Sequence, residues 1–194
     1  MTHYQNKFFN IHRDSVNYTK QDFFNLLSNK YGFNIELSHN YLMSDGTIGF
    51  SKWKSWLWLL QYNPNEYVDD LFMTRNEFIE KSTHRSILDI EIVFDIDEKG
   101  DYISIEENAK HVCIELKTLN KPFVCYSTGS KGFHIHTFCG SLRDLSSTER
   151  FEFKKKLMIF LKTDSLKCGN RSMIAIEGEP HWKSGKIKKE VDLL

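Results

Sequence analysis

The sequence predicts an α+β fold in which helices flank a mixed or antiparallel central sheet. Segments with apolar residues at helical spacing are interspersed, at short intervals, with segments in which apolar and polar residues alternate. Several of the connections between apolar strands are short and contain glycine, which is typical of hairpins. Strands and helices mixed in this way, with hairpins between neighbouring strands, indicate the α+β class.

Composition is that of a globular protein. Of the 194 residues, 40% are hydrophobic and 27% are charged. Basic and acidic residues balance at 26 each, so the total charge predicts no partner. Residues 143–194 hold 12 basic and 8 acidic residues, an excess of 12 − 8 = +4. This excess fits either a polyanion-binding face or an ordinary solvated surface.

No apolar run approaches the ~18 residues that a membrane span requires, and the polar N-terminus does not resemble a signal peptide. The four cysteines, Cys113, Cys125, Cys139 and Cys168, lack the C-x-x-C spacing of zinc sites. We therefore expect no membrane partner, no structural zinc and an intracellular location.

Each predicted element has its own signal. A helix over 20–31 follows the capping residue Thr19 and stops at Gly32, and Thr74 with Glu77 predicts a short capped helix. Segment 51–64 fits a helix or a strand equally well. Further helices are predicted over 104–120 and 146–163, and strands over 87–97, 122–127, 133–140, 172–178 and, after a turn, up to Val191.

The strand over 87–97 ends in two carboxylates, Asp95 and Asp97, on the same face. Successive residues on one face are two rises of ~3.3 Å apart, which separates these groups by ~6–7 Å. Carboxylates this close repel each other unless a cation lies between them. Oxygen ligands favour Mg²⁺ or Mn²⁺. A solvated strand end is the alternative, and sugar-nucleotide transferases also place Mn²⁺ on a D-x-D pair.

The loop "STGSKGFH" (127–134) joins two predicted strands. Gly129 and Gly132 flank Ser130 and Lys131, and His134 follows shortly after. The loop therefore offers backbone N–H groups, a hydroxyl and an ammonium close together. This combination suits phosphate binding. The spacing differs from G-x-x-x-x-G-K-[ST], and no helix follows. A glycine-rich hairpin with two ordinary strand histidines, His134 and His136, is the alternative.

A third motif, "EGEPHWKSGK" (177–186), places His181 and Lys183 on either side of Trp182 before a Ser-Gly turn and more lysines. We interpret it as a site for a triphosphate or a nucleic-acid backbone. A basic hairpin without a ligand is the alternative.

In this order the three motifs resemble the archaeo-eukaryotic primase superfamily, which includes primase small subunits, primase-polymerases and the polymerase domain of bacterial end-joining ligases. "IVFDID" is similar to the first family motif, "TGSKGFH" to the second, S/T-G-x-x-G-x-H, and "MIAIEGEPHWKSG" to an apolar strand followed by H-x-K-[ST]-G. The likeness covers residues 86–191, and residues 1–85 show no matching motif.

The resemblance implies a primase-polymerase fold with an RRM-like catalytic half. It implies a single catalytic domain over 1–194, with the catalytic motifs in 86–194 and an unassigned N-terminal portion in 1–85. The zinc-binding stem of archaeal primase subunits is not visible.

The resemblance also implies the site residues. Asp95 and Asp97, with Asp164 as the third carboxylate, are the expected catalytic ligands of two Mg²⁺ or Mn²⁺ ions, and Glu177 is the fallback for Asp164. The expected nucleotide-binding residues are Ser130, Lys131, Gly132, His134, His181 and Lys183.

The activity implied is template-directed synthesis of short primers on single-stranded DNA from nucleoside triphosphates, by a two-metal mechanism. An extension-only polymerase for repair or end joining, a catalytically inactive nucleic-acid-binding replication subunit and a D-x-D glycosyltransferase are the alternatives. Because no nucleotide-hydrolysis loop is present, we expect a helicase or another replication subunit, in trans or in a longer chain.

Overall fold

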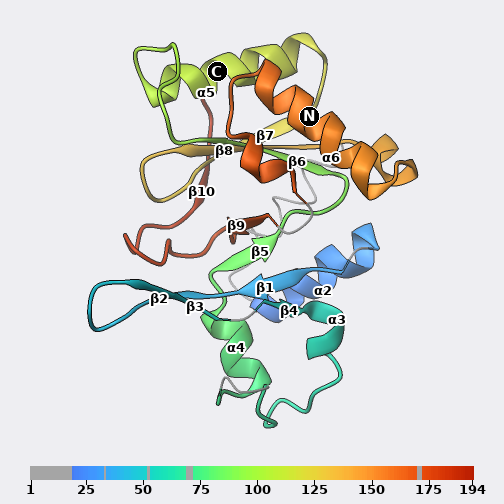
Figure 1. The fold of residues 1–194 in the computed structure, drawn as a ribbon, viewed down its shortest axis with the longest axis vertical. Coiled ribbons are helices and arrows are strands. Elements are labelled where there is room, and N and C mark those ends of the chain that lie inside the picture. The colour runs from blue at the N-terminus through green and yellow to red at the C-terminus, as the bar shows by residue number, and fades with distance from the viewer. Residues whose placement is uncertain (1–18, 33, 52, 69–71, 170–171) are drawn as a thin grey trace.

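The computed structural model describes residues 19–32, 34–51, 53–68, 72–169 and 172–194. Two four-stranded sheets form its body, and a separate two-stranded hairpin extends away from it (Figure 1). Every strand pair in the described residues is antiparallel. The α+β class with an antiparallel sheet and flanking helices is therefore confirmed.

The first sheet belongs mainly to the N-terminal half of the chain. Its strands, in order, are β4 (Lys54–Ser55), β1 (Glu36–Ser38), β5 (His84–Ser86) and β9 (Met173–Ala175). It shares a hydrophobic core with α2 (Lys20–Tyr31), α3 (Trp56–Leu59) and α4 (Arg75–Lys81). The projecting hairpin is formed by β2 (Asn40–Leu42) and β3 (Ile48–Phe50).

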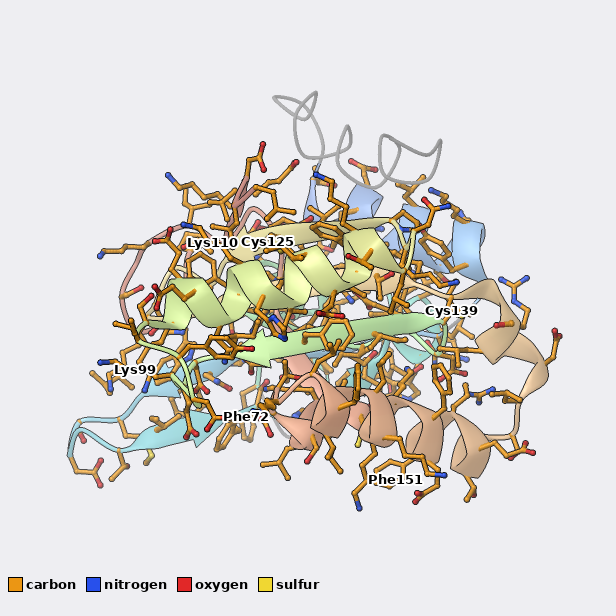
Figure 2. The ribbon with its side chains drawn as sticks, turned by 90° about the horizontal axis from the view of Figure 1, so that it is seen from above. Phe72, Lys99, Lys110, Cys125, Cys139 and Phe151 are labelled. Atoms are coloured by element: carbon orange, nitrogen blue, oxygen red, sulfur yellow. The ribbon has the colours of Figure 1, made fainter. Side chains whose placement is uncertain are left out.

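The second sheet carries the first two predicted motifs, and the third lies between β9 of the first sheet and β10 of the second. Its strands, in order, are β10 (Lys189–Val191), β7 (Phe123–Ser127), β8 (Phe133–Phe138) and β6 (Glu91–Ile96). Helices α5 (Ile105–Thr118) and α6 (Ser147–Phe160) lie side by side over one face of this sheet (Figures 1 and 2). Two 3₁₀ turns, η2 (Gly140–Asp144) and η3 (Ser165–Cys168), flank α6. Within the described residues, no helix has the length and apolarity that a bilayer span requires.

Local sequence signals account for these helices. Thr19, Thr74, Ser104 and Ser146 each close a capping box with an acidic residue three positions on, and Gly32 ends α2 in the left-handed conformation.

Alternation along β6 also follows the prediction. Ile92, Phe94 and Ile96 pack into the core beneath α5 and α6, which leaves Glu91 and Asp95 on the opposite face.

Two segments differ from the sequence prediction in detail. Strand β6 begins at Glu91, not at residue 87, because a turn precedes it, in which the N–H of Glu91 donates to the carbonyl of Leu88 at 3.0 Å. Segment 51–64 contains both candidate structures, a short β4 and then α3, which Ser55 caps. In addition, Lys154 of α6 is buried, although lysine is normally exposed, and its Nζ donates to the carbonyl of Leu88, 3.3 Å away.

A buried ionic network joins the two sheets. Arg85 of β5 donates to both Glu91 of β6 (2.9 Å) and Glu177, which follows β9 (2.8 Å). Lys188 donates to Glu177 at 2.8 Å, and His136 of β8 lies 2.7 Å from Glu91. All five side chains are fully buried. Because unpaired charges are costly in an interior, these pairs fix how the sheets meet.

Candidate active site

The candidate site lies where β6 and β8 meet the first sheet. Asp95 on β6 stands directly opposite His134 on β8 in the strand register. Asp95 Oδ1 lies 3.4 Å from His134 Nε2, and Asp95 Oδ2 lies 3.4 Å from the Nζ of Lys167 in η3. Strand pairing and one 3₁₀ turn therefore surround this carboxylate with two nitrogen donors.

These contacts keep Asp95 ionised. Burial alone raises the pKa of Asp95, but the hydrogen bond from His134 and the positive charge of Lys167 outweigh it and lower the pKa to about 2. Burial lowers the pKa of His134 to about 4, so its imidazole is neutral at pH 7. Its Nδ1 atom is buried without a hydrogen-bond partner. An unpaired ring nitrogen in such a place is free to bind a ligand group.

The loop between β7 and β8 is a compact turn held by Thr128. The hydroxyl of Thr128 accepts the N–H groups of Ser130 (3.3 Å) and Gly132 (3.4 Å). A Cβ atom on Gly132 would collide with the carbonyl oxygen of Ile96 and would lie 3.0 Å from Cα of Asp97. Glycine at this position therefore allows the loop to lie directly on the backbone of the carboxylate motif.

The same loop contacts the third motif on its other side. The N–H of His181 donates to the carbonyl of Lys186 at 2.7 Å and closes a turn. The Ser184 hydroxyl of this turn donates to the Gly129 carbonyl. A Cβ atom on Gly129 would collide with the Lys186 carbonyl, and its φ of +75° also favours glycine. The glycine loop thus connects the first and third motifs physically.

A cavity of about 180 Å³ opens between these motifs. From the residues predicted to form the site, it brings together Asp95, Asp97, Ser130, Lys131, Gly132, His134 and His181. Lys183 lies in the same turn as His181 but is not among the lining residues.

Sequence reasoning missed two residues of this cavity, His84 and Lys167. His84 comes from β5, in the portion to which no role was assigned, and burial lowers its pKa to about 4. Lys167 lies in a short turn after α6 and also donates to the carbonyl of Met173 at 3.4 Å. No periodicity or motif distinguishes either residue in the sequence.

Asp164 lines a neighbouring cavity of about 320 Å³, which Asp95 and Asp97 also line. Its backbone N–H donates to the carbonyl of Asp95 at 3.2 Å. Its carboxylate accepts the N–H of Leu166 at 2.8 Å and so caps η3. Asp164 is therefore adjacent to the carboxylate pair, and its role as the third metal ligand stays a prediction.

Glu177, the fallback, has a different environment. Both of its carboxylate oxygens bond to Arg85, and one also accepts from Lys188. It is fully buried in the ionic network and lines neither of the two cavities. Its contacts are those of a structural ion pair.

The carboxylate pair suits a hard divalent ion. Among the described residues the Asp97 carboxylate makes no hydrogen bond or ion pair, and Asp95 is ionised. In that same part of the chain, no three His, Cys, Asp or Glu side chains are gathered so as to hold a metal ion. An ion on this pair would take its remaining oxygen ligands from water or a bound phosphate, as Mg²⁺ commonly does.

Comparison with known proteins identifies the fold. The chain matches no family model and no curated protein. Among solved structures it is similar to the polymerase domain of Mycobacterium tuberculosis ligase D, determined in complex with DNA. The TM-score is 0.58 at 13% sequence identity, and the match covers 90% of this chain and 81% of that chain. The chain therefore has the fold of a polymerase domain.

Proposed function

We propose that this chain is a template-directed nucleotidyltransferase of the archaeo-eukaryotic primase superfamily, which makes short primers on single-stranded DNA from nucleoside triphosphates. One observation carries the proposal. Three motifs that are far apart in the sequence, represented by Asp95, Lys131 and His181, line one cavity.

The ligase D polymerase domain supports this proposal through its fold. Its structure was determined with DNA, and its fold extends over 90% of the present chain. The N-terminal sheet of the present chain supplies His84 to the cavity.

The side chains suggest a division of tasks. Lys131, Ser130 and the N–H groups of their loop hold the phosphates of the incoming nucleotide, since an ammonium and backbone donors together suit an anion. His134 is neutral and donates to Asp95 through Nε2, so its unpaired Nδ1 accepts one further hydrogen bond. His181 contacts the phosphates from the opposite wall.

Asp95 and Asp97 would hold Mg²⁺ or Mn²⁺, which supplies positive charge to the phosphates and makes the attacking 3′-hydroxyl easier to deprotonate. The protein contributes mainly positioning, which brings the hydroxyl and the phosphate into line.

A priming assay tests the proposal. The chain is incubated with a defined single-stranded DNA template, Mg²⁺ or Mn²⁺, and ribo- or deoxynucleoside triphosphates, without a primer. We expect short oligonucleotides from the wild type and a loss of about 10³-fold or more in the Asp95→Ala variant, because several kcal/mol of charge stabilisation depend on that carboxylate.

The matched control is Glu106→Ala, which removes an exposed carboxylate of α5 that pairs with Lys110 and with no other residue in the described part of the chain. This control should keep wild-type activity. Undiminished synthesis by Asp95→Ala would refute the assignment of the site.

An extension-only polymerase is the second candidate, favoured by the similarity to the ligase D domain. The same assay separates the two. A primase starts chains from two nucleotides on the bare template, whereas an extension-only enzyme yields products only after a primer is annealed.

A further inference from the structure

Lys167 places an ammonium beside Asp95, one of the two carboxylates predicted to hold a metal ion. Its ammonium lies 3.4 Å from Asp95 Oδ2 and lines the same cavity as the carboxylate pair. The side chain is about one quarter exposed, at 26%, and a second contact to the Met173 carbonyl holds it in place. Lys167 therefore brings a fixed positive charge to the catalytic carboxylate.

The carboxylates of the cavity match one ion better than two. Paired ions ~3.5–4 Å apart require carboxylate oxygens that bridge or flank both of them. Among the described residues, Asp95 and Asp97 supply the carboxylates of this cavity, and Asp164 lies in the neighbouring cavity that both also line. Both oxygens of Asp95 already face nitrogen donors, and Oδ1 of Asp164 accepts the N–H of Leu166 in its own turn.

We propose that the ammonium of Lys167 takes the place of a second divalent cation, so that the cavity binds a single Mg²⁺ or Mn²⁺ ion. This inference rests on the proposed function and refines it. The single ion binds Asp97 and Asp95, and Lys167 neutralises the outer oxygen of Asp95. Once a triphosphate enters, the same ammonium lies within the cavity that receives the phosphates.

Mn²⁺ binding to the whole chain tests the proposal without any turnover. Free Mn²⁺ is measured by electron paramagnetic resonance during titration, which gives the number of bound ions and their affinity. We expect one ion in the wild type. In Lys167→Met we expect one ion bound about tenfold or more tightly, because a competing cation has left Asp95. Lys167→Arg, which keeps the charge, should bind Mn²⁺ as the wild type does.

Activity should change in the opposite direction. With template and nucleotides, Lys167→Met should lower kcat by about 10²-fold, as expected for the loss of a preorganised charge. Lys167→Arg should recover most of it. A residue with only a structural role would not combine tighter metal binding with slower turnover.

Two outcomes would overturn the inference. One is two Mn²⁺ ions in the wild type, falling to one in Asp164→Asn, which would make Asp164 the third ligand. The other is unchanged or weaker Mn²⁺ binding in Lys167→Met. Template-directed synthesis with two bound ions would reject the single-ion site but not the proposed function. One bound ion without any synthesis would reject the proposed function but not the single-ion site.

Discussion

At the scale of single residues, the glycines of the β7–β8 loop explain how separate motifs form one cavity. Gly132 lies against the backbone of Ile96 and Asp97, and Gly129 lies against the carbonyl of Lys186. Any side chain at either position would push two motifs apart. The pattern G-x-x-G is therefore a packing requirement here as well as a source of N–H donors.

Gly132→Ala should consequently weaken both stability and activity. The added Cβ forces the Asp97 backbone or the loop to move, which we expect to cost about 1–3 kcal/mol of unfolding free energy. Chemical denaturation and the priming assay measure the two effects. Gly140→Ala is the control, because a Cβ there meets nothing within 4 Å. Equal behaviour of the two variants would contradict this packing argument.

At the scale of elements, the buried network determines how β5, β6 and the segment before β10 fit together. Arg85 and Glu177 are 92 positions apart in the chain yet share two hydrogen bonds. Burial opposes their charges, but the pairing lowers the pKa of Glu177 well below its ordinary value. The sheets are thus held together by a few specific ion pairs as well as by apolar packing.

Lys188→Met and Lys189→Met form a matched pair that tests this network. Lys188 is fully buried against Glu177, whereas its neighbour Lys189 is exposed. Removing the Lys188 ammonium leaves part of a buried carboxylate uncompensated, with an expected cost of about 3 kcal/mol. Lys189→Met should change stability little. Similar unfolding midpoints for the two variants would argue against a structural role for the network.

The same elements show which features of the fold could be predicted from the sequence and which could not. Capping residues such as Ser104 and the alternation along β6 act between near neighbours, so the helices and the face that carries Asp95 could be predicted. The burial of Arg85 and Lys188 could not, because charged residues are normally exposed and their partners are distant in the sequence.

The site shows the same division. Motif spacing predicted Asp95, Lys131 and His181 as site residues, because their residue types carry chemistry in a recognisable order, and the three line one cavity. His84 and Lys167 enter the cavity only because β5 and η3 pack beside β6. Their positions follow from tertiary structure, which a single sequence does not display.

At the scale of the whole molecule, the half-buried His84 links stability to pH. Burial lowers the pKa of His84 to about 4 from an ordinary value near 6.5. The unfolded chain therefore binds more protons than the folded chain between these values. The stability contributed by neutral His84 is complete above pH 6.5 and is lost as the pH falls toward 4.

We expect His84 to contribute up to about 1.4 kcal/mol per pH unit to the loss of unfolding free energy in that window. The His84→Gln variant should show a correspondingly flatter dependence when urea unfolding is followed from pH 7 to pH 4. A slope identical to that of the wild type would show that His84 titrates normally in the folded chain.

The central claim is that this cavity copies a template, and the identity of the incorporated nucleotide tests it most directly. Wild-type chain is supplied with Mn²⁺, all four nucleotides and a set of single strands that differ at one template base, and the base added opposite that position is determined. The account predicts the complementary base for each template. Incorporation that ignores the template base, or no incorporation at all with or without a primer, would contradict it.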